Sequence, residues 1–146
     1  MAAIGFYHLT RTTLIQALPR LLGRTLEAGE RALVMCPSAA MVADLDKGLW
    51  EASEPDWLPH GSESDGDADL QPVWIATDDQ APNGARFLFL VGGAASDRLD
   101  AFQRAFDLFD GNDPEAVAAA RSRWTAAKAA GHELTYWKHG PRGWEK

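Results

Sequence analysis

Short apolar runs alternate with segments of helical periodicity along the N-terminal third of the chain, and this order admits few folds. Residues 4–9 and 31–36 are short and almost continuously apolar, which is typical of strands buried on both faces of a sheet. Leucines recur at helical spacing from residue 12 or 13 to 27, and a second helix is expected over 37–50. A strand, helix, strand, helix order predicts a parallel sheet with right-handed crossovers. We therefore expect a three-layer α/β fold, with helices on both faces of a mixed, mostly parallel sheet.

The next part of the chain adds two further strands to this sheet. Residues 72–77 and 86–91 have the apolar composition of strands. The link between them is short and contains Pro82 and the turn residues Asn83-Gly84. This link predicts that the two strands pair as antiparallel neighbours.

Two segments leave alternatives open. Residues 97–110 favour a helical turn to about 104 and then a strand, although apolar residues at helical spacing run through the whole segment. Pro19 lies inside the first helix, where we expect it either to kink the helix or to end an initial turn. A last strand is expected over 133–138.

Length and composition indicate one domain, 1–146, with an acidic loop at about 61–70 and a loose C-terminal tail at about 139–146. No apolar run approaches the roughly 18 residues that a membrane helix requires, and the N-terminus lacks the order of a signal peptide. We therefore expect a cytoplasmic protein without a membrane partner. The formal net charge of -7 argues against strong direct DNA binding, because duplex binding depends on a basic surface.

The stretch 113–131 has helix start and stop signals at both ends, with an N-cap aspartate before a proline and a glycine after the last turn. At about 100° per residue, Arg121, Trp124 and Lys128 share one face of this helix, whereas Arg123 points elsewhere. Two cations beside a large aromatic ring suit an anionic partner. The alternative is that Trp124 belongs to the core and the cations form a solvated rim.

Sequence motifs for catalysis are missing. Gly92-Gly93 follows a strand, but neither a dinucleotide fingerprint nor a phosphate-binding loop motif is present. The four histidines lack zinc-ligand spacing, and Cys36 is expected to be a buried apolar residue rather than a nucleophile. We expect no catalytic residue, no metal site and no cofactor.

Six motifs spread over nearly the whole chain occur in the order of one known family. They are Phe6-Tyr7-x-Leu9, Leu45-Asp46-x-x-Leu49-Trp50, Leu58-Pro59-His60-Gly61, Phe106-Asp-Leu-Phe-Asp110, Ala119-Ala-Arg121-Ser-Arg123-Trp124 and Lys128-x-x-Gly131-His132. In these motifs the chain resembles the chi subunit of the bacterial DNA polymerase III holoenzyme. The resemblance implies an α/β fold like those of nucleotide-binding proteins, without catalytic activity. It also implies an adaptor that ties the clamp-loader complex to the acidic C-terminal tail of single-stranded DNA-binding protein.

The resemblance assigns tail binding to residues from two distant segments. Arg121 matches the family's cation and would pair with a carboxylate of the tail, while Trp124 would form a pocket wall. Trp50 matches a tryptophan that lines the same groove in the family. Lys128 is expected to add to a cationic rim, and Arg123 is a secondary candidate. This site requires that the end of the 37–50 helix lie against the 113–131 helix.

A second surface is implied by the segment Trp57, Leu58, Pro59 and His60. It matches the family segment that contacts a small partner, the psi subunit, which in some members connects chi to the clamp loader. The alternative is a proline-fixed loop in which Trp57 packs on its own core. For the whole protein, the alternatives to an adaptor are a nucleotide-binding enzyme on a Rossmann-like sheet and a direct nucleic-acid binder.

Overall fold

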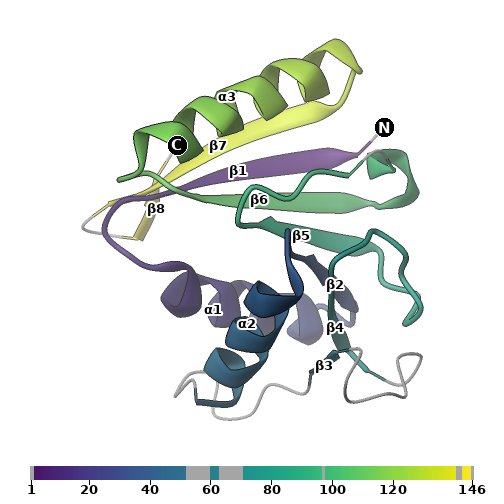
Figure 1. Cartoon of the computed structure of the whole chain (residues 1–146). Coiled ribbons are helices and arrows are strands. Elements are labelled where there is room, and N and C mark those ends of the chain that lie inside the picture. The colour runs from purple at the N-terminus through teal and green to yellow at the C-terminus, as the bar shows by residue number, and fades with distance from the viewer. Residues whose placement is uncertain (1, 52–59, 63–70, 97, 141–142, 146) are drawn as a thin grey trace.

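The computed structural model describes residues 2–51, 60–62, 71–96, 98–140 and 143–145, and its strands form one eight-stranded sheet (Figure 1). In chain order the elements are β1 (Ala3–Leu9), α1 (Leu14–Glu27), β2 (Ala32–Met35), α2 (Ala39–Glu51), β3 (Gly61–Ser62), β4 (Val73–Ala76), β5 (Phe87–Val91), η2 (Leu99–Ala101), β6 (Arg104–Asp110), α3 (Pro114–Ala129), β7 (Glu133–Gly140) and β8 (Gly143–Glu145). The strand order is β3-β4-β2-β5-β6-β1-β7-β8. All neighbouring pairs are parallel except β7 and β8, which confirms the mixed, mostly parallel sheet.

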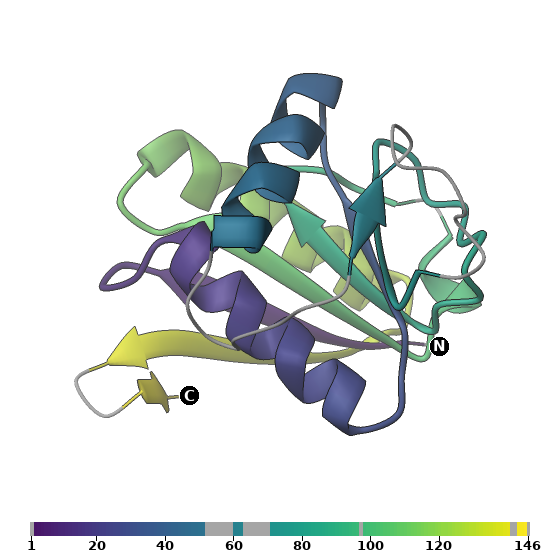
Figure 2. The ribbon, with the colours of Figure 1, turned by 90° about the horizontal axis from the view of Figure 1, so that it is seen from below.

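Helices cover both faces of the sheet, as predicted. α1 and α2 lie together on one face, and α3 lies on the other face beside β1 and β7 (Figures 1 and 2). Successive residues of a strand point alternately toward one helical layer and toward the opposite face. In β5, Phe87 and Phe89 join the core beneath α1 and α2, whereas Leu88 and Leu90 join the core on the α3 side. A strand covered on both faces needs apolar residues at every position, which explains the continuous apolar run of β5.

The prediction that the strands at 72–77 and 86–91 pair as antiparallel neighbours is wrong. β4 and β5 both pair in parallel with β2, which lies between them. The connection between β4 and β5 crosses the sheet face instead of turning back. Asn83 anchors this crossover, because its side-chain amide is buried and donates to the carbonyls of Ala32 at 3.1 Å and Gln71 at 3.0 Å.

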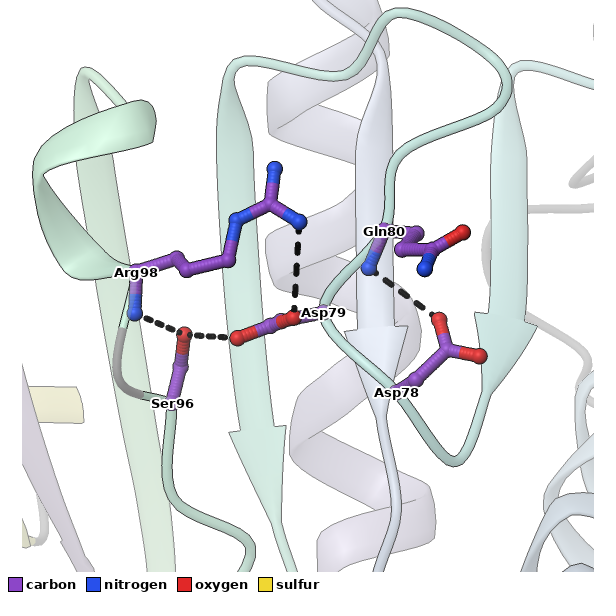
Figure 3. A network of polar contacts seen from close by, with 5 residues as sticks. All are labelled: Asp78, Asp79, Gln80, Ser96 and Arg98. Atoms are coloured by element: carbon purple, nitrogen blue, oxygen red, sulfur yellow. Dashed lines mark hydrogen bonds and ion pairs between the residues drawn. The ribbon is translucent and has the colours of Figure 1, made fainter.

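Two coil connections, after β4 and after β5, pack on the α3 side of the sheet. A polar network joins them (Figure 3). The Ser96 hydroxyl donates to Asp79 at 2.8 Å, the Arg98 guanidinium lies 3.8 Å from the same carboxylate, and the Arg98 amide donates to Ser96 at 3.0 Å. Asp78 accepts from the Gln80 amide at 3.1 Å within the first connection. These bonds hold the two coils together as a cover for the strands that α3 does not reach.

Four smaller expectations have mixed outcomes. The helical turn expected before β6 is confirmed as the short 3-10 helix η2. Pro19 does not end an initial turn, because α1 continues across it and its side chain is fully buried. The tail from 139 is not loose where the structure describes it, because β7 extends to Gly140 and β8 pairs with it. Of the expected acidic loop, 61–62 form β3 and 63–70 lie outside the described residues.

Candidate functional site

The helix α3 begins and ends where the sequence predicts. The Asp113 carboxylate accepts a hydrogen bond from the Glu115 amide at 3.0 Å, and Pro114 occupies the first helical position. Gly131 follows the helix with a φ of +86°, a conformation that suits glycine. The buried residues of α3 are Ala120 and Ala127. Because these side chains are small, room remains between the helix and the sheet.

A pocket of about 250 Å³ fills part of this room, between α3 and the strands β1, β6 and β7. Its lining consists of five apolar and three polar or charged side chains: Phe6, Phe109, Val117, Ala120 and Trp124, with His8, Arg121 and Tyr136. The strands place these residues together because the Phe6 and Tyr136 backbones are register partners, as are those of His8 and Phe109. Register partners in a parallel sheet project from the same face.

Aromatic rings make the apolar part of the pocket. The Trp124 ring meets Phe6 edge to face, with centroids 5.1 Å apart and an interplanar angle of 65°. Trp124 is half-buried: it packs against the core on the α3 side and also lines the pocket. The ring of His8 stacks on Phe109 at a centroid distance of 5.0 Å.

Polar groups lie at the rim of the same pocket. Arg121 is exposed and forms no ion pair with the residues that the structure describes. His8 Nδ1 and the Tyr136 hydroxyl share a hydrogen bond. Burial raises the pKa of Tyr136, and the positive charge of Arg121 opposes this rise, which places the guanidinium within electrostatic reach of the phenol. The site therefore presents a free cation beside an aromatic hollow.

Arg123 does not contribute to this pocket. Its guanidinium forms a two-pronged pair with Asp107 of β6, Nε to Oδ2 at 2.6 Å and Nη2 to Oδ1 at 2.9 Å. The side chain of Asp107 is 3% exposed and that of Arg123 is 15% exposed. A cation that neutralises a buried carboxylate is less available to a partner, so the pairing with Asp107 argues against the secondary assignment of Arg123 to tail binding.

Trp50 is also separated from the pocket. It ends α2 on the opposite face of the sheet from α3, so Trp50 and Arg121 do not line one groove (Figure 1). Trp50 is 58% exposed and packs on His60, with ring centroids 4.3 Å apart. His60 is buried, and its Nε2 lies 3.1 Å from the Asp46 carboxylate. The prediction that Trp50 lines one groove with Arg121 and Trp124 is therefore wrong.

Comparison with known proteins identifies the family of this chain. The family described as DNA polymerase III chi subunit, HolC, matches residues 1–135, nearly the whole chain. The chain belongs to this family. A probable DNA polymerase III subunit chi from Rickettsia prowazekii (strain Madrid E) is 26% identical over 91 residues, which cover 62% of the chain and 55% of that relative. The chain thus spans little more than half the length of the curated relative that it matches.

Within this chi-family fold, the remaining predicted residues are partly placed. Lys128 is exposed one turn beyond Trp124 and does not line the pocket. Trp57, Leu58 and Pro59 lie outside the described residues, and His60 lies beside Trp50. In the described ranges, no cluster of side chains could hold a metal ion, and no helix is long and apolar enough to span a membrane.

Sequence reasoning missed the residues that the strands bring to the pocket, chiefly Phe6, His8, Phe109 and Tyr136. Alternation in the first strand does place Phe6 and His8 on one face. The neighbours of β1 in the sheet could not be predicted, because local spacing does not reveal that β6 and β7 flank it.

Proposed function

We propose that this chain is a non-catalytic accessory subunit of DNA polymerase III that docks the acidic C-terminal tail of single-stranded DNA-binding protein in the α3 pocket. The observation that carries the proposal is the exposed guanidinium of Arg121 beside a hollow walled by Trp124 and Phe6. A chain end offers an apolar side chain and a free carboxylate on one residue. The pocket offers an apolar hollow and a cation at one place, which matches that chemistry.

Residues beyond the pocket fit the acidic residues that precede the chain end. Lys128 lies on α3 near the C-terminal end of the helix and is exposed. Lys138 is exposed on β7, and its backbone is the register partner of His8. Both cations flank the pocket in a chain whose net charge is -7. They favour an acidic peptide by long-range attraction, which salt would screen.

The opposite face supports a separate surface toward the clamp loader. Trp50 is a large exposed apolar side chain that packs on His60, the last residue of the segment that resembles the psi-contacting segment of the family. An adaptor must hold two partners at once, so its two docking surfaces must not overlap. The placement of Trp50 and Arg121 on opposite faces meets this requirement, so we propose that Trp50 belongs to the clamp-loader side.

Calorimetric titration of a synthetic acidic peptide that ends in an aromatic residue with a free carboxylate tests the docking proposal. We expect a Kd of about micromolar order for the wild type and a loss of at least roughly tenfold for Arg121→Ala, because a charge-assisted pair disappears. Arg20→Ala removes the same charge from an exposed position on α1 and should leave the Kd unchanged. Equal affinity for wild type and Arg121→Ala would refute the assignment of Arg121.

A nucleotide-binding enzyme is the second candidate, and one feature favours it. A hollow of about 660 Å³ lies where β1 and β6 end. After these two neighbouring strands, the chain enters helices on opposite faces of the sheet. Ligands of open α/β sheets usually bind at such a point. Its lining includes Asp110, Asp113 and Glu115, while its one lining cation, Arg123, is already paired. Phosphates would meet three carboxylates there, so we favour the adaptor. A thermal shift with nucleotides would reverse this preference.

A further inference from the structure

We propose that His8 and Tyr136 make peptide docking pH-dependent. When His8 is protonated, it no longer accepts the hydrogen bond of the Tyr136 hydroxyl, and this hydroxyl can then donate a hydrogen bond to the peptide carboxylate. This inference rests on the proposed docking function of the same pocket. It adds a second donor beside Arg121 and a condition under which that donor acts.

The structure fixes His8 in place from three sides. Its ring stacks on Phe109, and its Nε2 lies 3.5 Å from the Gly111 carbonyl oxygen. Its Nδ1 meets the Tyr136 hydroxyl. Gly111 has to be a glycine for this arrangement, because a Cβ at 111 would overlap His8 Cδ2. The backbone after β6 therefore leaves space for this imidazole in one position.

The hydrogen-bond directions follow from which atoms carry protons. A carbonyl oxygen only accepts, so a neutral His8 ring carries its proton on Nε2, toward Gly111. Nδ1 then accepts the one proton of the Tyr136 hydroxyl, and that hydroxyl has no proton left for a ligand. When His8 takes a proton from solvent, Nδ1 becomes a donor to the Tyr136 oxygen. The Tyr136 hydroxyl proton is then free to donate to a carboxylate in the pocket.

The surroundings set the sign of the pH dependence. The charged or titratable groups that face His8 are Tyr136 and Lys138 on β7 and Arg121 on α3, while β6 presents Phe109 and Gly111 follows this strand. A bound carboxylate in the pocket lies beside a protonated His8, so carboxylate binding and proton uptake at His8 favour each other. Imidazoles change charge between about pH 5 and 8. Docking should therefore take up protons and become tighter as pH falls through that range.

Titration of a rhodamine-labelled peptide of aspartates ending in phenylalanine with a free carboxylate tests the inference. Its Kd is measured at about pH 6 and about pH 8 at equal ionic strength, where the peptide carboxylates stay ionised. The wild type should bind about three- to tenfold more tightly at the lower pH, the effect of one added donor and charge. His8→Phe keeps an aromatic ring on Phe109 and should reduce this ratio to near one. Tyr136→Phe, which removes the hydroxyl donor, should lower the ratio of the two Kd values below that of the wild type.

The outcomes separate this inference from the docking proposal. A wild-type Kd that is equal at both pH values, or a full pH ratio in His8→Phe, would overturn the role of His8 and leave docking intact. Absence of binding at both pH values would overturn docking itself. Circular dichroism checks that each variant is folded, and Tyr136→Phe, at a 38% exposed residue, keeps the test available if His8→Phe does not fold.

Discussion

Asp107 is the one buried carboxylate in the part of the chain that the structure describes, and Arg123 neutralises it from α3. Burial raises the pKa of Asp107, and the Arg123 guanidinium opposes this rise. Arg123→Ala would leave the carboxylate buried without its partner. We expect the free energy of unfolding to fall by about 3 kcal/mol near neutral pH, measured by urea denaturation. Peptide affinity of the folded variant should stay within about twofold of the wild type, since Arg123 lies outside the pocket.

The loss in Arg123→Ala should shrink in acid. A carboxyl group whose pKa is higher in the folded than in the unfolded chain destabilises the fold above the folded pKa, and this cost fades as pH falls toward the unfolded value. The difference in Tm between wild type and variant should therefore be smaller at about pH 5 than at about pH 7. The double variant Asp107→Leu/Arg123→Met, which removes both charges, should regain most of the stability. A double variant as unstable as Arg123→Ala would contradict this account.

Cys36 should be inert in the folded protein. Its thiol is fully buried, and burial raises its pKa to about 12, so the reactive thiolate is scarce at neutral pH. We expect a chromogenic disulfide reagent at about pH 8 to label the native protein at least about a hundredfold more slowly than the urea-unfolded chain. Complete labelling of the native protein within minutes would show that this part of the core opens readily.

At the scale of elements, α3 carries much of the pocket, and its N-terminus depends on one side chain. Asp113 satisfies the Glu115 amide, which would otherwise lack a helical partner. Asp113→Ala should lower the free energy of unfolding by about 1 kcal/mol, whereas Asp113→Ser, which can still accept this bond, should lose less. Chemical denaturation of both variants measures the difference. Equal losses for alanine and serine would exclude the cap as the cause.

The elements also show where local sequence reasoning stops. The caps of α3 are set by neighbouring residues, so the bounds of this helix could be predicted. The pairing of β4 and β5 could not, because β2, some forty residues upstream of β4, inserts between them. A short link permits a hairpin but does not require one. Here Asn83 binds Ala32 and fixes the link as a crossover.

At the scale of the whole molecule, the sheet separates the pocket with Arg121 and Trp124 from the surface with Trp50, which the resemblance places in one groove. Arg121 and Trp124 were recognisable from the sequence because they lie on one helix, and they do line one pocket. The resemblance assigns Trp50 to the same groove, but the face on which α2 packs depends on the topology of the complete sheet. The same non-local pairing hid the contributions of β1, β6 and β7.

Because the two surfaces are separate, we expect that Trp50 does not contribute to the affinity for the peptide. Trp50→Ala should leave the Kd for the acidic peptide within about twofold of the wild type, because sites that share no contacts act additively. Binding of the clamp-loader side partner, measured by pull-down with purified clamp-loader complex, should weaken in the same variant. A Trp50→Ala variant that loses the peptide instead would place both residues in one functional site.

The central claim is that the acidic peptide docks between α3 and β1 rather than beside α2. The most direct test is a nuclear magnetic resonance titration of the ¹⁵N-labelled protein with the peptide, following the indole N–H signals of Trp124 and Trp50. We predict that the Trp124 signal and the amides of β1 near His8 shift with peptide concentration, while the Trp50 signal stays in place. A shift of the Trp50 signal without a shift of the Trp124 signal would contradict the account.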